Sequence, residues 1–88
     1  MDERMIRMMH DTGALQRLQE MVGGGEILRD HGDVPALRVA DGVEFCNVTG
    51  RPDDYDLWLY DDLGRTGLDV RQAATVALAV LAERRVNP

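Results

Sequence analysis

The sequence predicts an α+β fold: an antiparallel sheet of three to four strands flanked by N-terminal and C-terminal helices, in the order α-β-β-β-β-α. Apolar residues recur at helical spacing at both ends of the chain, whereas the middle alternates between apolar and polar residues and is broken by turn residues. A chain of 88 residues has room for one domain, spanning 1–88, and for one core.

The N-terminal segment 2–22 is predicted to be helical because its apolar residues follow one another at steps of three and four. These residues are Met1, Met5, Met8, Met9, Leu15, Leu18 and Val22. Glycine disfavours a helix interior by about 1 kcal/mol, so the segment can divide at residues 11–13, which include Gly13. The glycine run 23–25 is expected to end the helix.

Three extended segments are expected next, at 26–30, 35–40 and 43–48, the first of them as an edge strand. Asp41-Gly42 separates the second from the third and is a strong hairpin signal. A three-residue loop with a left-handed Gly42 gives the hairpin one clean apolar face. The cross-strand pairs expected in this register are Val39 with Val43 and Leu37 with Phe45.

The fourth strand, 55–60, is apolar on both faces, which is typical of a strand with neighbours on both sides or with both faces covered. The last element is a helix over 70–85, with Asp69 or Thr66 as its N-cap. Between positions 73 and 82 it is apolar at every position except Thr75. A single apolar stripe needs about half as many such positions, so this helix is expected to be buried on more than one side or to let another helix approach closely.

Composition narrows the possible functions. The net charge is −6, from sixteen carboxylates and ten arginines, and this disfavours direct binding to nucleic acid or to an anionic membrane. The chain has no lysine and no serine, which excludes a serine nucleophile, a Schiff-base lysine and a P-loop lysine. Cys46 is a lone thiol, expected to act as a small buried filler, and fits a reducing compartment.

No apolar run approaches the roughly 18 residues of a membrane span, and the N-terminus does not have the form of a signal peptide. We therefore expect a cytoplasmic protein.

His10 and His31 lack the spaced partners of a metal or catalytic motif, so no cofactor, no metal and no catalytic residue is predicted.

Five aspartates lie within ten residues and are interleaved with aromatic side chains. The stretch comprises Asp53, Asp54, Asp56, Asp61 and Asp62, together with Tyr55, Trp58 and Tyr60. One interpretation is ordinary turn and strand-end chemistry, in which charges also discourage edge-to-edge aggregation. A second is a surface for a basic protein partner, anchored by the aromatic residues. A third, a divalent metal site, is disfavoured because the spacing departs from that of a calcium-binding loop.

The closing segment 67–83, GLDVRQAATVALAVLAE, resembles the terminal helix of many small uncharacterised actinobacterial and actinobacteriophage proteins. In those proteins a Leu-x-x-x-x-Ala start leads into an Ala/Leu-rich helix after a short antiparallel sheet. The sequence departs from that pattern at Val70-Arg71-Gln72, where two acidic residues often follow the cap. The resemblance implies an actinobacterial or actinobacteriophage source and an architecture, but no activity and no site residues.

The favoured hypothesis is a non-enzymatic protein-interaction factor that self-associates as a homodimer; a phage-encoded, host-directed factor is one form of it. The apolar C-terminal helix and the two-faced fourth strand motivate it, because so short a chain has little left to cover both. Self-association is assigned to Trp58, Tyr60, Val76 and Val80. The alternative is an acidic decoy that mimics nucleic acid and occupies a basic DNA- or RNA-binding protein. In that case the partner surface comprises Asp53, Asp54, Asp56, Trp58, Tyr60, Asp61 and Asp62.

Overall fold

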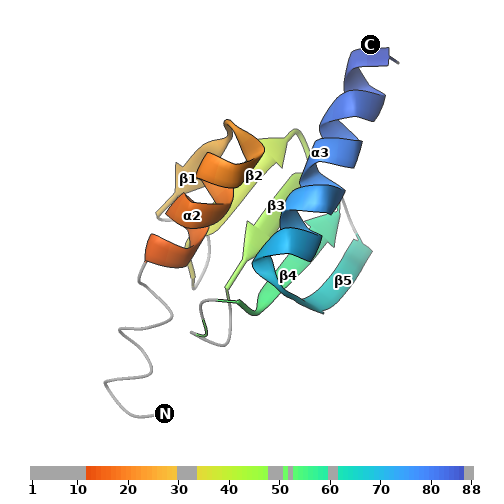
Figure 1. Ribbon diagram of the computed structural model, residues 1–88. Coiled ribbons are helices and arrows are strands. Elements are labelled where there is room, and N and C mark those ends of the chain that lie inside the picture. Colours follow the sequence, from red (N-terminus) through yellow and green to blue (C-terminus); the bar gives the residue numbers. More distant parts are fainter. Residues whose placement is uncertain (1–11, 30–33, 48–50, 52, 60–61, 87–88) are drawn as a thin grey trace.

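A computed structural model describes residues 12–29, 34–47, 51, 53–59 and 62–86, and shows two helices and one five-stranded sheet (Figure 1). The elements are α2 (Gly13–Val22), β1 (Glu26–Leu28), β2 (Ala36–Ala40), β3 (Val43–Cys46), β4 (Tyr55–Leu59), β5 (Asp62–Leu68) and α3 (Val70–Val86). The predicted α+β class is confirmed. Positions 2–11 of the predicted N-terminal helix lie outside the described residues.

The predicted number of strands was too low by one. The additional strand is β5, whose sequence DLGRTGL contains two glycines and only one β-branched residue. Such a segment has little intrinsic preference for a strand. It is held by antiparallel pairing with β4, in a register that sets Leu59 opposite Asp62 and Tyr55 opposite Leu68.

The sheet is a meander in the order β1-β2-β3-β4-β5, with every neighbouring pair antiparallel. Each strand therefore pairs with the next along the chain, and β1 and β5 form the two edges. β4 lies between β3 and β5, which confirms the prediction that this strand has neighbours on both sides.

The β2–β3 hairpin forms at Asp41-Gly42, and Gly42 takes the predicted left-handed conformation, with a φ of +75°. Leu37 lies opposite Phe45, as expected, and both side chains are fully buried.

The predicted pairing of Val39 with Val43 was wrong in detail. Ala40 lies opposite Val43, because the register shifts between Arg38 and Ala40 and leaves Val39 as the extra residue of a bulge. The bulge still directs Val39 into the core beside Val43, so the hairpin keeps the single apolar face from which its register was predicted.

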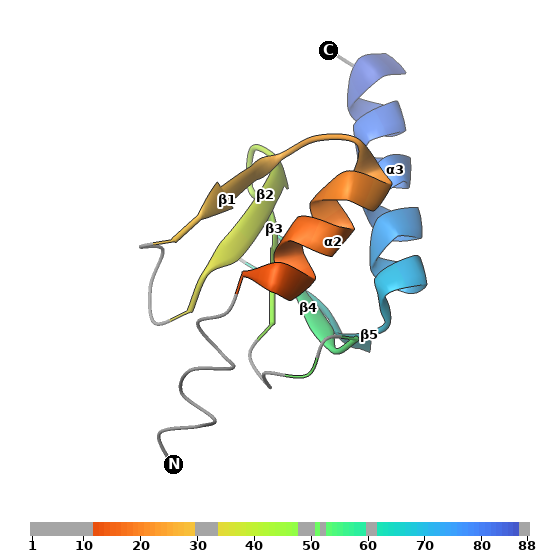
Figure 2. The ribbon, with the colours of Figure 1, turned by 60° about the vertical axis from the view of Figure 1, so that its left-hand side comes forward.

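Both helices lie against one face of the sheet, side by side, and no described helix lies against the other face (Figures 1 and 2). The core lies between the two layers. It comprises Leu15, Leu18, Val22, Leu37, Val39, Val43, Phe45, Tyr55, Leu57, Leu68, Val70, Ala73, Ala74 and Ala77. Because side chains alternate along a strand, the face turned away from the helices carries Arg38, Glu44, Cys46, Asp56 and Trp58. We call this the open face.

Helix α3 is less buried than its composition suggested. It contacts α2 and the sheet through one side, which includes Ala73 and Ala77, whereas Leu78 is 47% exposed. The alanines are small enough for α2 and the strands to approach closely, which was one of the two predicted alternatives. Among the described residues, burial of α3 on several sides is not observed.

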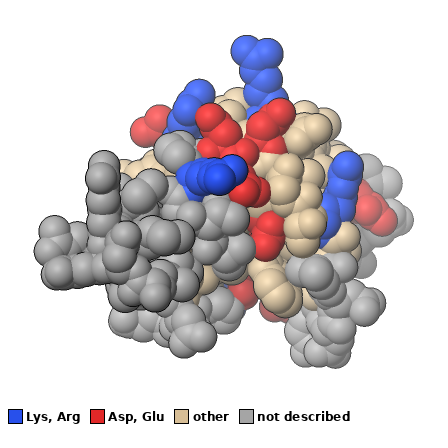
Figure 3. All heavy atoms as spheres, turned by 90° about the horizontal axis from the view of Figure 1, so that it is seen from below, with Lys and Arg blue, Asp and Glu red and all other residues tan. Residues whose placement is uncertain are grey.

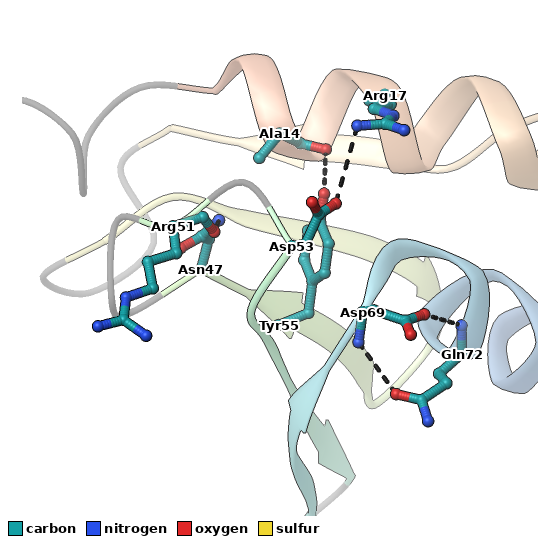
Figure 4. A network of polar contacts seen from close by, with 8 residues as sticks. All are labelled: Ala14, Arg17, Asn47, Arg51, Asp53, Tyr55, Asp69 and Gln72. Carbon is teal, nitrogen blue, oxygen red and sulfur yellow. Dashed lines mark hydrogen bonds and ion pairs between the residues drawn. The ribbon is translucent and has the colours of Figure 1, made fainter.

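A reciprocal pair of hydrogen bonds fixes the start of α3 (Figure 4). The Gln72 backbone N–H donates to Asp69 Oδ1 at 2.8 Å, and the Asp69 N–H donates to Gln72 Oε1 at 3.1 Å. This is a capping box with Asp69 as N-cap, one of the two predicted cap residues. Near the other end of the helix, Arg84 Nη2 donates to the Asp41 carbonyl at 2.7 Å and ties α3 to the β2–β3 turn.

Candidate interaction surface

Two large apolar side chains are exposed at the end of β4. Tyr55 and Leu57 at the start of the strand are buried, whereas Trp58 and Leu59 are 44% and 40% exposed. Alternation places Trp58 on the open face and Leu59 on the side of the helices. Both faces of the sheet therefore present an apolar side chain at the same end of the same strand.

On the open face, Trp58 belongs to a row that crosses three strands. Glu44 lies opposite Trp58 in the β3–β4 register, and Arg38 lies opposite Glu44 in the β2–β3 register. Arg38 donates to Glu44 Oε1 twice, from Nε at 3.2 Å and from Nη2 at 3.0 Å. The pair is partly buried, with the Arg38 side chain 41% and the Glu44 side chain 16% exposed. It supplies the carboxylate beside the indole with a charge partner within the chain.

Cys46 lies on the same face and is half-buried. Burial, and after it the neighbouring carboxylates of Glu44 and Asp56, raise the pKa of its thiol to about 11. The thiol is therefore protonated at neutral pH and is a poor nucleophile. Cys46 was expected to be a small buried filler, but its side chain is only half-buried.

On the side of the helices, Leu59 lines a hollow of about 440 Å³ between the sheet and the C-terminal half of α3. The other lining residues are Val43, Val80, Glu83 and Arg84. Val80, assigned to self-association from the sequence, therefore lies close to Leu59. Val76, assigned with it, is also only partly buried against the core. The hollow combines apolar walls with one acidic and one basic side chain.

Two described aspartates of the acidic stretch, Asp53 and Asp56, have partners within the chain. The Asp53 carboxylate lies 3.7 Å from Arg17 Nη1, and Asp56 Oδ1 accepts a hydrogen bond from the Gly67 N–H at 3.2 Å. Asp53 and Asp54 also line an open hollow of about 590 Å³, together with Arg51 and Gly67.

Seen from below, carboxylates and arginines alternate over the described surface (Figure 3). Arg17 and Arg51 lie beside Asp53 and Asp54, so the surface around these aspartates is mixed in charge rather than uniformly negative. Of the other predicted partner residues, Tyr60 and Asp61 lie outside the described residues, and Asp62 is described only as a backbone position in β5.

One polar contact was not predicted from the sequence, which offered Tyr55 only as part of an apolar strand face. The Tyr55 hydroxyl donates to the Ala14 carbonyl at 2.6 Å and joins β4 to the first turn of α2 (Figure 4). Burial, assisted by the nearby Asp53 carboxylate, raises the pKa of Tyr55 to about 12, while Arg17 opposes the shift.

A second buried polar group lies in the loop after β3. Asn47 Nδ2 donates to the Arg51 carbonyl at 2.5 Å, and Asn47 Oδ1 has no hydrogen-bond partner in the described part of the chain. The hydrogen bond from Asn47 Nδ2 thus ties the end of β3 to Arg51, shortly before β4 begins.

No group of three His, Cys, Asp or Glu side chains within residues 12–29, 34–47, 51, 53–59 and 62–86 is arranged to hold a metal ion. His10 and His31 lie outside those residues. Neither described helix has the length and hydropathy that a bilayer-spanning segment needs.

Comparison with protein-family models, with curated proteins and with solved structures gives no match for this chain. The resemblance of segment 67–83 to actinobacterial and actinobacteriophage proteins stays a prediction.

Proposed function

We propose that this chain is a non-enzymatic protein-interaction factor that self-associates, with a homodimer as its working form. One observation carries the proposal: Trp58 and Leu59, adjacent in sequence, leave apolar surface exposed on opposite faces of the sheet at one end of β4. Large apolar side chains exposed singly are common, but on the helix side Leu59 also borders a hollow lined by Val43 and Val80, and such an extended apolar surface is typical of an interface.

The chemistry around Trp58 suits a contact that is covered in a complex. Tryptophan is the residue type most often found as an energetic anchor at protein interfaces. The charges nearest to it in the β2–β3–β4 row, Arg38 and Glu44, form an ion pair within the chain. Covering the indole therefore leaves no new unpaired charge at that point, and such a charge is the main penalty for burying a mixed surface.

A protein partner also fits the overall charge. With a net charge of −6, the surface repels nucleic acid and anionic membranes at long range. The raised pKa of Cys46 and the internal partners of Asp53 and Asp56 support a role other than catalysis. We place such a factor in the cytoplasm, where a lone unpaired thiol persists.

The proposal is tested by sedimentation velocity over a wide range of protein concentration. Trp58→Ala is compared with Met21→Ala, a matched control because Met21 is exposed to the same degree, 44%, and lies on α2 rather than on β4 or α3. We expect wild type and the control to associate equally and Trp58→Ala to associate more weakly. Equal association of all three proteins would remove Trp58 from the interface, and a monomeric wild type would refute self-association.

The acidic decoy is the competing hypothesis, and it makes a different prediction. Replacement of Asp53, Asp54, Asp56, Asp61 and Asp62 by asparagine would abolish capture of a basic nucleic-acid-binding protein and leave self-association intact. The charge alternation in Figure 3 weighs against it, because a decoy depends on a continuous negative surface. A basic protein captured by the wild type and lost from the five-fold variant would nevertheless establish it.

A further inference from the structure

We infer that the open face carries a binding site for an arginine side chain of a partner protein, formed by Trp58, Glu44 and Asp56. The site uses the indole that the proposed function assigns to self-association, and it gives that indole a second kind of partner. The inference goes beyond self-association and does not depend on it, because a monomer presents the same three side chains.

The geometry comes from the pairing of β3 with β4. Glu44 lies opposite Trp58, and Cys46 lies opposite Asp56. Positions two apart on a strand share a face, so these four side chains form a square on the open face. The carboxylates of Glu44 and Asp56 lie on one diagonal of the square, and such diagonal neighbours are about 7–8 Å apart. A group that rests against the indole between them is within reach of both.

The charge on this face favours a cation. Among the described residues of β1 to β4, the open face carries three carboxylates, on Glu26, Glu44 and Asp56, against one guanidinium, on Arg38. Burial raises the pKa of Cys46, and Glu44 and Asp56 then both contribute to the rise, so both carboxylates act within the square. A positive group placed there is attracted by both of them.

Each carboxylate is held by a hydrogen bond from a neighbouring strand. Arg38 on β2 donates to Glu44 Oε1, and the Gly67 N–H on β5 donates to Asp56 Oδ1 at 3.2 Å. β2 and β5 flank β3 and β4, so these donors come from outside the square. Asp56 has no cation as a partner in the described part of the chain. The site is therefore ordered before binding, which lowers the entropic cost of binding, and it has a carboxylate left to pair.

The exposed indole selects the kind of cation. Trp58 is 44% exposed, and an aromatic face attracts organic cations, arginine more often than lysine. A planar guanidinium stacks on the ring and still directs its donors to two carboxylates, whereas a lysine ammonium acts as a compact point charge. Arginine and tryptophan are also both common anchors of protein interfaces. An arginine on a partner's surface therefore fits all three side chains of the site.

The structure also separates this site from the rest of the acidic stretch. Asp56 lies on the open face, whereas Asp53 and Asp54 line a hollow together with Arg51. Arg17 lies 3.7 Å from the Asp53 carboxylate. The chain thus supplies its own arginines around Asp53 and Asp54, and an arginine from a partner is better accommodated beside Asp56.

The experiment follows peptide binding by two-dimensional ¹⁵N NMR. The probes are a blocked peptide, Ala-Leu-Arg-Leu-Ala, and the same peptide with citrulline, which has the shape of arginine without its charge. Trp58 is the single tryptophan, so its indole N–H gives one resonance. We expect the arginine peptide to shift this resonance and the amides of Glu44 and Asp56. The citrulline peptide should bind about fivefold more weakly, the factor of a surface ion pair at the upper end of its usual range.

Two variants of equal charge locate the site. Asp56→Asn removes one carboxylate but keeps an oxygen for the Gly67 N–H, so it should retain the fold and weaken binding of the arginine peptide by about fivefold. Glu20→Gln removes the same charge from an exposed position on α2 and should leave the affinity nearly unchanged. Equal effects of the two variants would show that only the net charge of the chain attracts the peptide, and would overturn the site.

Three further results would overturn it as well: equal binding of the two peptides, shifts confined to another surface, or no binding at millimolar peptide. The titrations are made at a protein concentration at which wild type sediments as a monomer. A wild type that dimerises at higher concentration but ignores the peptide would overturn this inference alone. A wild type that is monomeric at every concentration and binds the peptide would refute only the proposed self-association.

Discussion

The Tyr55 hydroxyl donates a 2.6 Å hydrogen bond to the Ala14 carbonyl, across 41 positions of the chain. Tyr55 is the first residue of β4, and its side chain is fully buried in the core. Ala14 lies in the first turn of α2. The contact therefore joins the helical layer to the sheet close to Asp53 and Asn47, and it fixes α2 over β4, the strand that carries Trp58 (Figure 4).

Removing only the hydroxyl, with Tyr55→Phe, should lower the free energy of unfolding by about 1 kcal/mol. The partly buried Ala14 carbonyl loses the hydroxyl donor while the packing of the ring is retained. Urea denaturation followed by circular dichroism measures the change. Thr75→Val is a suitable control, because it removes a hydroxyl whose bond to the Arg71 carbonyl is exposed on α3, and a small change is expected.

The same variant gives a prediction about pH. The folded pKa of Tyr55, about 12, is above its ordinary value of 10.0, so the folded state holds this proton more tightly than the unfolded chain does. The resulting contribution to stability is complete below pH 10 and is lost as the pH rises towards 12. The difference in unfolding free energy between wild type and Tyr55→Phe should shrink over that interval. A difference that stays constant up to pH 12 would contradict the assignment.

Cys46 should react slowly with iodoacetamide. Its pKa of about 11 lies two units above the reference value of 9.0, so the thiolate fraction near pH 8 is about a hundredfold lower than in a free thiol of ordinary pKa. Alkylation followed by mass spectrometry should show the native rate far below that in urea, and the native rate should rise up to about pH 11. Equal rates in the native and unfolded protein would show that the open face does not shield the thiol.

The capping box at the start of α3 should be worth about 1 kcal/mol, so Asp69→Ala should lower the thermal midpoint measurably. Asp69→Asn is the matched variant, since asparagine retains an oxygen that can accept from the Gln72 N–H, and it should lose much less. If both variants lowered the thermal midpoint by the same amount, the capping hydrogen bond would not be the cause.

Two adjacent glycines after α2 should differ sharply in their tolerance of alanine. Gly25 has a φ of +109°, and a Cβ there would lie 3.0 Å from the Arg38 carbonyl oxygen and 3.0 Å from Leu37 Cδ1. Gly25→Ala should therefore destabilise the fold by about 1–3 kcal/mol. At Gly24 a Cβ meets nothing within 4 Å, and Gly24→Ala should be nearly neutral. Chemical denaturation of the two variants side by side provides the comparison.

The features that the sequence predicted correctly depend on local chemistry. Asp41-Gly42 specifies a tight hairpin, and Asp69, one of the two predicted N-caps, specifies a helix start, because in each case the interacting groups lie within a few residues of one another. The alternation in β4 likewise separated Trp58 from Tyr55 and Leu57 before any pairing was known.

The features that it missed depend on long-range packing. β5 has weak strand propensity around Gly64 and Gly67 and becomes a strand only through its pairing with β4. The burial of α3 was overestimated from its composition. Many alanines show that a helix has few polar side chains, but they do not show that other elements pack against all of its sides, and Leu78 on α3 is 47% exposed. The Tyr55–Ala14 bond has no local sequence signal at all.

The central claim is that the chain self-associates, and sedimentation equilibrium of the wild-type protein tests it most directly. The account predicts a concentration-dependent mass that reaches twice the 9.8 kDa of one chain, with no other component present. A mass of 9.8 kDa that stays constant up to the highest soluble concentration would contradict it, and Trp58 and Leu59 would then be exposed for a different partner.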